Sequence, residues 1–280
     1  FYEMNQLNDI VDYQDERVDK LIENFWPGPM TLILNAKENN GISKKVSAGL
    51  STLAVRMPSN KTARQILKET KVLLAAPSAN TSGKPSPTKF EHVYHDLNGK
   101  IDVIIEDEQS DIGLESTVID CTRTPLVIAR PGEITKEDIE GILGLGSVKY
   151  NDEVMVDTQT PIAPGMKYRH YAPTTPVVVV EGSLEFGHSI IEEYQEQGEK
   201  VAVMATEDIL DAVSSKVKEF YSLGKKDSIA DMSHHLFNAL RSLDHTDATI
   251  ILAQASGKEG AGLAYMNRLE KASSFTKTER

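Results

Sequence analysis

A loop of small and hydroxyl-bearing residues, "PSANTSGKPSPT", spans residues 77–88 and carries a single charge, Lys84. Small residues let backbone N–H groups approach a ligand closely, and hydroxyls add donors that bring no charge. The prolines restrict the loop before a ligand arrives, so less conformational entropy is lost on binding. This chemistry suits nucleotide phosphates, although the loop lacks the Gly-Lys-Ser/Thr of a Walker motif. Alone, the same composition is also that of a surface turn. We call residues 77–88 the serine–proline loop.

Two arginines end apolar segments shortly before a proline. Arg56, in "STLAVRMPS", is separated from its proline by one residue, and Arg130, in "LVIARPGEIT", directly precedes its proline. Such arginines lie where the chain leaves a sheet, a common place for binding groups. A guanidinium offers a planar fork of donors to carboxylates and phosphates. "GLESTVID" adds Ser116 at the start of a further apolar segment. By itself, each arginine is more typical of a solvated surface cation, and Ser116 of an ordinary strand start.

A basic and aromatic cluster lies in "APGMKYRHYAPTTP", residues 163–176, and it is bounded by prolines. The cluster contains Lys167, Tyr168, Arg169, His170 and Tyr171. A rigid spacer would have this composition, and so would a segment that closes over an anionic site.

The elements that would position these residues differ between the two halves of the chain. In residues 1–150, apolar segments predict strands at 30–34, 53–57, 72–76, 101–106, 117–120 and 126–129. Helical spacing of apolar residues predicts helices near 18–25, 90–97 and 136–143. Because several strands follow one another without helices, the sheet is expected to be mixed.

Beyond residue 174 strands and helices alternate strictly, which predicts a smaller parallel sheet with helices on its faces. The predicted strands are 177–181, 200–205, 217–221 and 248–254, and the helices are 184–195, 207–214, 232–243 and 262–272. A polar stretch without periodicity separates the halves. The fold class is therefore α/β, with domains at 1–150 and 174–280 and a linker at 151–173.

Composition narrows the classes of function. The chain has 280 residues, 40% of them hydrophobic, and a net charge of −12. A chain this acidic is a poor candidate for binding nucleic acid through broad neutralisation of its phosphates. We therefore expect a small-molecule site and no stable tRNA binding. The apolar runs are too short to cross a membrane. One cysteine, Cys121, excludes a disulfide framework and favours a cytoplasmic location. The seven histidines show no metal-ligand spacing, so no metal site is predicted.

Six motifs in order, "FWPGPMTLIL", "AVRMPS", "APSANTSGKPSPT", "GLESTVID", "ARPGEIT" and "APGMKYRHYAP", resemble the L-threonylcarbamoyladenylate synthase family. They span residues 25–173. The resemblance is to the two-domain form, a mixed-sheet YrdC-like catalytic domain followed by a smaller Rossmann-like α/β domain.

The resemblance implies that L-threonine, bicarbonate and ATP give threonylcarbamoyl-AMP and pyrophosphate, with Mg²⁺ bound mainly through ATP. A separate transferase would then modify the tRNA adenosine beside the anticodon. By position in the motifs, the residues that match threonine contacts are Thr52, Arg56, Ala76 and Ser116. Those that match ATP contacts are Ser78, Asn80, Ser86, Arg130, His170 and Tyr171. No catalytic nucleophile or base is implied.

One family feature is absent from these 280 residues. In the family, a basic segment with a Lys-Gly-Arg-Pro core precedes the stretch that matches Phe1 and supplies cations for the triphosphate. We therefore expect these residues by themselves to make little threonylcarbamoyl-AMP, since preorganised charges carry much of such catalysis.

Two alternative functions differ in the features that they require. An RNA-binding or regulatory module of the same fold stays open, and a steep salt dependence of tRNA binding would distinguish it. A carbamoyltransferase of the hydrogenase-maturation kind carries a similar domain, but it adds cysteine-rich zinc modules that a single cysteine excludes.

Overall fold

A computed structural model describes residues 1–154 and 170–279. These residues divide into two compact units, each with its own core. The first unit consists of residues 1–77 and 115–154, and the second of residues 78–114 and 170–279. We call residues 78–114, which interrupt the first unit in the sequence, the inserted segment.

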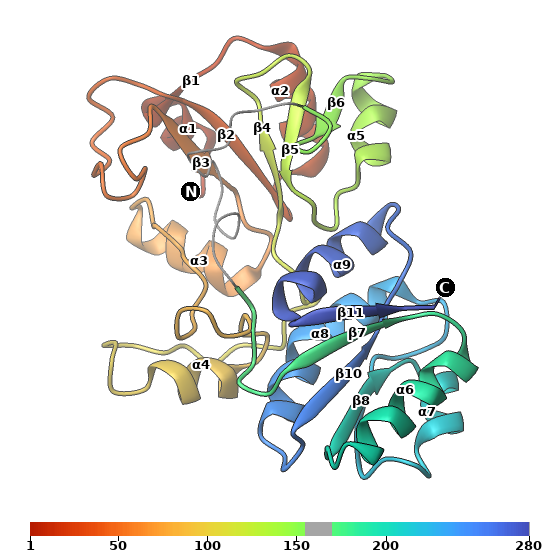
Figure 1. Cartoon of the computed structure of the whole chain (residues 1–280). Helices are drawn as coiled ribbons and strands as arrows, with labels where there is room; N and C mark the ends of the chain where they lie inside the picture. Colours follow the sequence, from red (N-terminus) through yellow and green to blue (C-terminus); the bar gives the residue numbers. More distant parts are fainter. Residues whose placement is uncertain (155–169, 280) are drawn as a thin grey trace. The chain divides into compact units, whose positions relative to one another are not determined.

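The first unit is built on a mixed sheet of six strands (Figure 1). Its strands are β1 (Val11–Asp12), β2 (Met30–Ala36), β3 (Thr52–Val55), β4 (Thr117–Asp120), β5 (Leu126–Arg130) and β6 (Val148–Tyr150). Its helices are α1 (Met4–Ile10), α2 (Glu16–Phe25), α3 (Lys61–Thr70) and α5 (Lys136–Leu143). The strand order is β1-β2-β4-β5-β6, and β3 also pairs with β2. Pairs β2–β4 and β5–β6 are parallel, whereas β2–β3 and β4–β5 are antiparallel. The predicted mixed sheet is thus confirmed.

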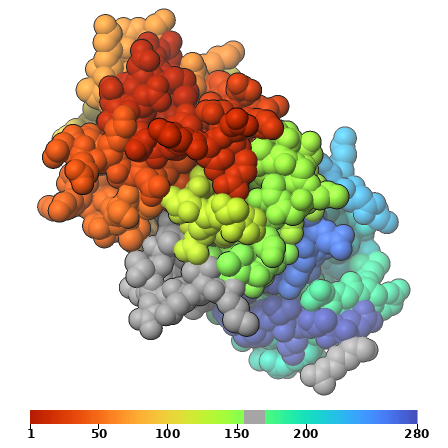
Figure 2. Space-filling model, turned by 90° about the horizontal axis from the view of Figure 1, so that it is seen from above, coloured from red at the N-terminus to blue at the C-terminus, as the bar shows by residue number. Residues whose placement is uncertain are grey.

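The first core lies between this sheet and the helices α1, α2 and α5. Leu21 of α2, Leu32 of β2 and Ile139 of α5 are all fully buried in it. Helix α5 begins where expected because Thr135 and Asp138 form a capping box. Residues from the two parts of the unit, red to orange and yellow-green to green, adjoin on the face drawn in Figure 2.

The second unit is built on an all-parallel sheet of five strands in the order β11-β7-β10-β8-β9. Its strands are β7 (Val177–Glu181), β8 (Val201–Ala205), β9 (Glu219–Ser222), β10 (Ile250–Gln254) and β11 (Phe275–Thr278). Its helices are α4 (Phe90–Leu97), α6 (Leu184–Glu196), α7 (Glu207–Val213), α8 (Ile229–Asp244) and α9 (Ala261–Ala272). Parallel strands need crossover connections, and the helices between the strands supply them.

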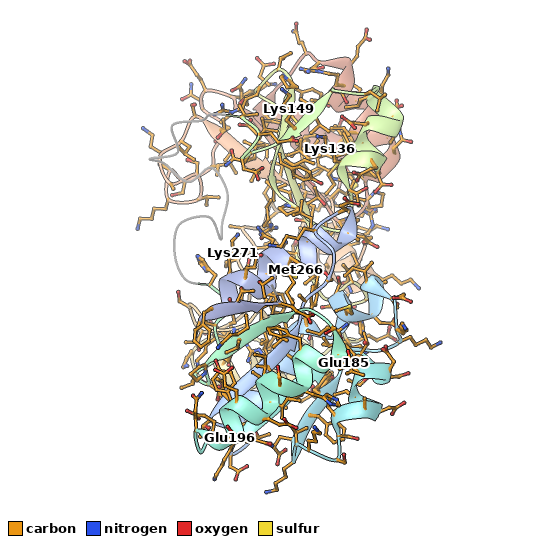
Figure 3. All side chains as sticks on the ribbon, turned by 45° about the vertical axis from the view of Figure 1, so that its right-hand side comes forward. Lys136, Lys149, Glu185, Glu196, Met266 and Lys271 are labelled. Carbon is orange, nitrogen blue, oxygen red and sulfur yellow. The ribbon has the colours of Figure 1, made fainter. Side chains whose placement is uncertain are left out.

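Helices cover both faces of the parallel sheet because successive strand residues point to opposite sides. Val177 and Val179 belong to the core under α8 and α9, while Val178 between them belongs to the core under α6 and α7. Figure 3 shows Glu185 and Glu196 on α6 and Met266 and Lys271 on α9, on opposite sides of this sheet. The predicted helix-covered parallel sheet is confirmed, with β11 as an unpredicted edge strand.

Two predicted strands are wrong: the structure has no strand at 72–76 or 101–106. Val72 and Leu74 are about half exposed, at 50% and 51%, and Val103 is 70% exposed. A short apolar run is consistent with a strand, but hydrogen-bonded pairing with a neighbour defines one, and neither segment pairs with a described strand.

The domain boundaries predicted at residues 150 and 174 remain a prediction, because they concern which parts of the chain fold independently. Most of the predicted linker, residues 155–169, lies outside the described residues, and Lys167, Tyr168 and Arg169 lie there too. No helix among the described residues combines the length and apolar character that crossing a bilayer requires.

Candidate functional site

One end of the first unit's sheet collects three of the predicted site residues. The register pairs Leu32 with Val55, Met30 with Thr117, and Val118 with Arg130. The start of β2 therefore lies beside the end of β3, the start of β4 and the end of β5. Arg56 follows β3, Ser116 precedes β4 and Arg130 ends β5, so all three lie at this same end.

Arg130 is engaged with Ser116. Its Nε and Nη2 donate to the Ser116 carbonyl oxygen at 3.2 and 2.9 Å, and Nη2 also lies 3.2 Å from Ser116 Oγ. Ser116 is 6% exposed, and its hydroxyl shares a hydrogen bond of 2.7 Å with that of Thr31, the second residue of β2. Thr31 was not among the predicted residues; its place in "FWPGPMTLIL" was the available signal.

The turn after β5 explains part of the motif "ARPGEIT". A Cβ on Gly132 would lie 2.4 Å from the backbone nitrogen of Thr117, which is closer than real Cβ contacts come. Glycine at this position therefore lets the chain pass against the start of β4. The turn and the Arg130–Ser116 contact hold the same short stretch of backbone from two sides.

Arg56 has different surroundings from Arg130. Its side chain is exposed, and its guanidinium makes no ion pair or hydrogen bond with any residue that the structure describes. Nearby protein atoms still displace part of its hydration, and this desolvation lowers the pKa of the guanidinium. A partly desolvated cation without a counter-ion is well suited to bind a carboxylate or phosphate.

Thr52 lies on the same face of β3 as Arg56 but at the opposite end of the strand. Four residues of extended chain separate the two, which corresponds to about 13 Å at roughly 3.3 Å per residue. Thr52 pairs in register with Asn35, near the end of β2. A single amino-acid ligand at Arg56 is shorter than this separation between Cα atoms.

Ala76 is exposed in the first unit, in the segment 72–76 that does not form a strand.

Within the serine–proline loop, the Asn80 side chain and the backbone form local hydrogen bonds. Asn80 Nδ2 donates to the carbonyl oxygens of Thr81 and Lys84 at 2.8 and 3.2 Å, and the Lys84 N–H donates to the Thr81 carbonyl. The Oδ1 atom of Asn80 is buried and accepts from no described donor. With Nδ2 committed in this way, Asn80 has an acceptor rather than a donor left for a ligand.

Ser78 and Ser86, which flank this turn, differ in burial. Ser78 is exposed, whereas Ser86 is 6% exposed. The Lys84 ammonium lies 3.6 Å from the Asp244 carboxylate and hydrogen-bonds the Thr174 hydroxyl. The one charge of the loop is therefore already partly compensated.

His170 and Tyr171 lie in the second unit. Tyr171 is 7% exposed in the core under α8, with its ring centroid 5.1 Å from that of Phe237. Its φ of 65° is in the left-handed region, which few non-glycine residues adopt. Burial of the ring fixes this end of the linker. His170 is half-buried, and its ring centroid lies 5.9 Å from that of Tyr171.

Two concave features lie elsewhere. A cavity of about 250 Å³ lies at the carboxyl ends of β7, β8 and β10, with Val203, Leu252 and Gln254 among its lining. A shallow hollow of about 460 Å³ lies between the end of α2 and the start of α5. None of the predicted site residues lines either one. In the described part of the chain, no three His, Cys, Asp or Glu side chains converge as metal ligands would.

Two family models match the chain in succession. A model of the Sua5, YciO and YrdC proteins, described as "Telomere recombination", matches residues 1–132. A model described as "Threonylcarbamoyl-AMP synthase, C-terminal domain" matches residues 134–274.

Individual relatives agree with both models. The chain is 42% identical over 270 residues to the threonylcarbamoyl-AMP synthase of Bacillus subtilis, an alignment that covers 96% of this chain and 77% of that protein. It is 42% identical to the threonylcarbamoyl-AMP synthase of Pyrococcus abyssi over 265 residues, covering 93% and 74%.

Solved structures extend the likeness to three dimensions. The crystal structure of P. abyssi Sua5 complexed with L-threonine has a TM-score of 0.89, 39% identity, and coverage of 100% of this chain and 81% of that one. A second P. abyssi Sua5 structure, of a variant with adjacent histidine and tyrosine replaced by alanine, also has a TM-score of 0.89, at 38% identity, covering 100% of this chain and 80% of that one.

Proposed function

Because the chain belongs to the two-domain threonylcarbamoyl-AMP synthase family, we propose that it uses L-threonine, bicarbonate and ATP for this synthesis. The threonine amine adds to the carbon of bicarbonate with loss of water, which gives an N-carboxylate. An oxygen of that carboxylate then attacks the α-phosphorus of ATP, the bond to the β-phosphate oxygen breaks, and pyrophosphate leaves. Such transfers ask the protein mainly for positioning and charge stabilisation.

The observation that carries the proposal is the position of Arg56. Its unpaired guanidinium lies at the same sheet end as Ser116 and Arg130. We assign the threonine carboxylate to Arg56 and the threonine polar groups to Ser116, with Ala76 contributing its backbone. Thr52 would add its hydroxyl to the threonine site, because the long side chain of Arg56 can span much of the about 13 Å between the two Cα atoms.

The nucleotide contacts follow from the serine–proline loop. Ser78 and Ser86 would donate to phosphate oxygens, and Asn80 would offer its buried Oδ1 to a donor such as metal-bound water. Arg130, which matches an adenylate contact by its position in the motif "ARPGEIT", would bind the adenylate. His170 and Tyr171 would contact the nucleotide from a fixed position, because the ring of Tyr171 is buried in the core. Because no cluster of metal ligands lies among the described residues, Mg²⁺ would enter with the ATP phosphates.

The partners follow from the product. A mixed anhydride of a carbamate and a phosphate is an activated acyl group, so a transferase that acts on tRNA adenosine must take it up. A cytoplasmic location would place both proteins with tRNA. The enzyme itself would not hold tRNA stably, since its net charge is −12.

The test is pyrophosphate release by the full-length natural protein, with mass spectrometry of the nucleotide product. We expect release only when threonine, bicarbonate, ATP and Mg²⁺ are all present, together with a product of the mass of threonylcarbamoyl-AMP. Release that persists without threonine or bicarbonate would contradict the reaction. Tight, salt-sensitive tRNA binding without release would favour the regulatory alternative.

A further inference from the structure

Helix α8 has two faces with different tasks. Leu236, Phe237 and Leu240 are fully buried in the core that the helix shares with the parallel sheet. The other face carries His234, Asn238 and Arg241, and His245 follows as the residue that caps the helix end, so the four are spaced by four, three and four residues. This spacing places the four side chains in one row along the helix. Each of the four contacts the inserted segment.

Arg241 is the central contact of this row. Its side chain is 8% exposed, and its Nε and Nη2 donate to the carbonyl oxygen of Pro85 at 3.1 and 2.6 Å. Its Nη1 and Nη2 also donate to the two oxygens of Asp96 at 3.2 and 2.8 Å. One guanidinium therefore ties the serine–proline loop and helix α4 to α8, which a lysine ammonium could not do with the same planar geometry.

Asp96 also contacts the serine–proline loop. Its Oδ2 accepts from the Thr81 N–H at 3.0 Å, and His95 Nδ1 lies 3.1 Å from Oδ1. Burial by itself would raise the pKa of Asp96, but the hydrogen bonds from Arg241, His95 and Thr81 outweigh burial and hold this pKa well below its usual range. The carboxylate is thus charged at neutral pH, and the loop is held at Thr81 as well as at Pro85.

A second link joins the end of the loop to α8. The Thr88 N–H donates to His92 Nδ1 at 3.1 Å, and His92 Nε2 lies 3.1 Å from Asn238 Oδ1. Burial and then the charge of Arg241 lower the pKa of His92 to about 4, so the ring is neutral at physiological pH. Since Nδ1 is the acceptor, the proton is on Nε2 and points to Asn238, whose amide in turn donates to the Tyr221 hydroxyl.

A third link reaches the middle of the loop. The Ala172 N–H donates to the carbonyl oxygen of Gly83 at 3.0 Å. Lys84 contacts Thr174 and Asp244, and Asp244 is the last residue of α8. Between residues 81 and 88, the loop is therefore anchored at five positions by the rest of the second unit.

We propose that Arg241 is a positioning residue for ATP, because it fixes the serine–proline loop in the shape that binds the phosphates. The inference rests on the proposed function, since it takes Ser78, Asn80 and Ser86 as nucleotide contacts. On this inference the carboxyl-terminal α/β part of the chain contributes to ATP binding, because contacts with helix α8 preorganise the loop before ATP binds. Preorganisation raises affinity because less ordering is left for the ligand to impose.

The chemistry of the Arg241–Asp96 pair supports a positional task. A buried ion pair contributes little net stability compared with well-packed apolar residues of the same volume, whereas removal of one partner leaves an uncompensated buried charge. The contribution of the pair to the free energy of unfolding therefore does not by itself account for its presence at this position. Its geometry, with two hydrogen bonds to Pro85 and a bidentate contact to Asp96, favours a role in fixing the loop.

The experiment separates positioning from stability with four variants of the full-length protein. Arg241→Met removes the fork, Arg241→Lys keeps the charge, and the double variant Arg241→Met with Asp96→Leu replaces the pair by apolar residues. Lys200→Met is the matched control, because it removes one cation from an exposed ion pair, 3.0 Å from Asp247, in the same unit. The readouts are melting temperature, KM for ATP, KM for threonine, and ATP affinity by calorimetry.

We expect the double variant to melt at a higher temperature than Arg241→Met, because it leaves no uncompensated buried charge, and still to show a KM for ATP raised about tenfold or more, with KM for threonine changed less than twofold. Arg241→Lys should be intermediate, and Lys200→Met should match wild type. Wild-type ATP affinity in the double variant, or an equal rise in both KM values, would overturn the proposal. If wild type makes no threonylcarbamoyl-AMP, the proposed function fails, and calorimetry with ATP still decides the role of Arg241.

Discussion

Two arginines leave strands at the same end of the first sheet, and their surroundings give them different tasks. Arg130 holds the backbone and hydroxyl of Ser116 through three contacts of 2.9–3.2 Å. Arg56 is exposed, and the described residues offer its guanidinium no acceptor. At the scale of single residues, Arg130 is hydrogen-bonded to Ser116, whereas the guanidinium of Arg56 is available to a ligand.

Replacement of Arg56 by Ala should weaken threonine or ATP binding by about 1.5–3 kcal/mol, the range for a hydrogen bond to a charged group. The melting temperature should stay within about a degree of wild type, because an exposed side chain without a partner adds little stability. Isothermal titration calorimetry with each ligand measures the effect. Lys20→Ala, which removes an exposed cation from α2, is the control. Wild-type affinity of the Arg56 variant for both ligands would reduce Arg56 to a surface cation.

At the scale of elements, the backbone of the inserted segment lies close against helix α8 at Gly113. Its φ is +79°, and a Cβ at this position would lie 2.5 Å from the Cα and 2.6 Å from the carbonyl oxygen of His234. Backbone atoms cannot move aside as a flexible side chain can. The glycine of "GLESTVID" is therefore required by the contact with α8, in addition to the conformation of its own turn.

This contact predicts a difference between two glycine substitutions in the inserted segment. Gly99 has nearly the same φ, +76°, but no atom lies within 4 Å of a Cβ built there. Gly99→Ala should cost about 1 kcal/mol for the left-handed backbone. Gly113→Ala should cost about 1–3 kcal/mol more, because overpacking is added to the same strain. Chemical denaturation followed by circular dichroism measures both, and equal costs would show that the segment does not pack tightly on α8.

At the scale of the whole molecule, charge decides which ligands can be held. The chain has 42 acidic and 30 basic residues, which gives its net charge of −12. Several of the cations are already paired with carboxylates, Arg17 with Asp15 and Arg241 with Asp96 among them. A small anion can still bind where one cation is free, as at Arg56, whereas a long polyanion meets a repulsive background.

The charge predicts weak tRNA binding with little dependence on salt. In a filter-binding titration at about 0.15 M salt, we expect no saturable binding at micromolar protein. Fewer than about two phosphate contacts should be apparent from the slope of log affinity against log salt concentration. A basic tRNA-binding protein run in parallel shows that the assay can detect such contacts. A steep slope for this chain would mean that cations gather on a surface in spite of the net charge.

The sequence alone determined what local patterns encode. Strict alternation after residue 174 predicted the parallel sheet, because a period of two for strands and 3.6 for helices is visible in the residues themselves. Helix α5 was predicted at 136–143 from the helical spacing of its apolar residues, and the structure shows that Thr135 and Asp138 cap its start. The same motifs that carried the family resemblance named Arg56, Ser116 and Arg130, which register brings to one end of a sheet.

The tertiary structure decided what depends on contacts between distant residues. The segments 72–76 and 101–106 have the apolar pattern of strands, yet they pair with no described strand, since pairing is not written in a segment's own residues. Arg56 and Arg130 have similar local sequences, and only the long-range register and burial distinguish the free guanidinium from the engaged one. The contact of Arg241 with Pro85 spans 156 residues of sequence, so no local pattern could have shown that α8 holds the serine–proline loop.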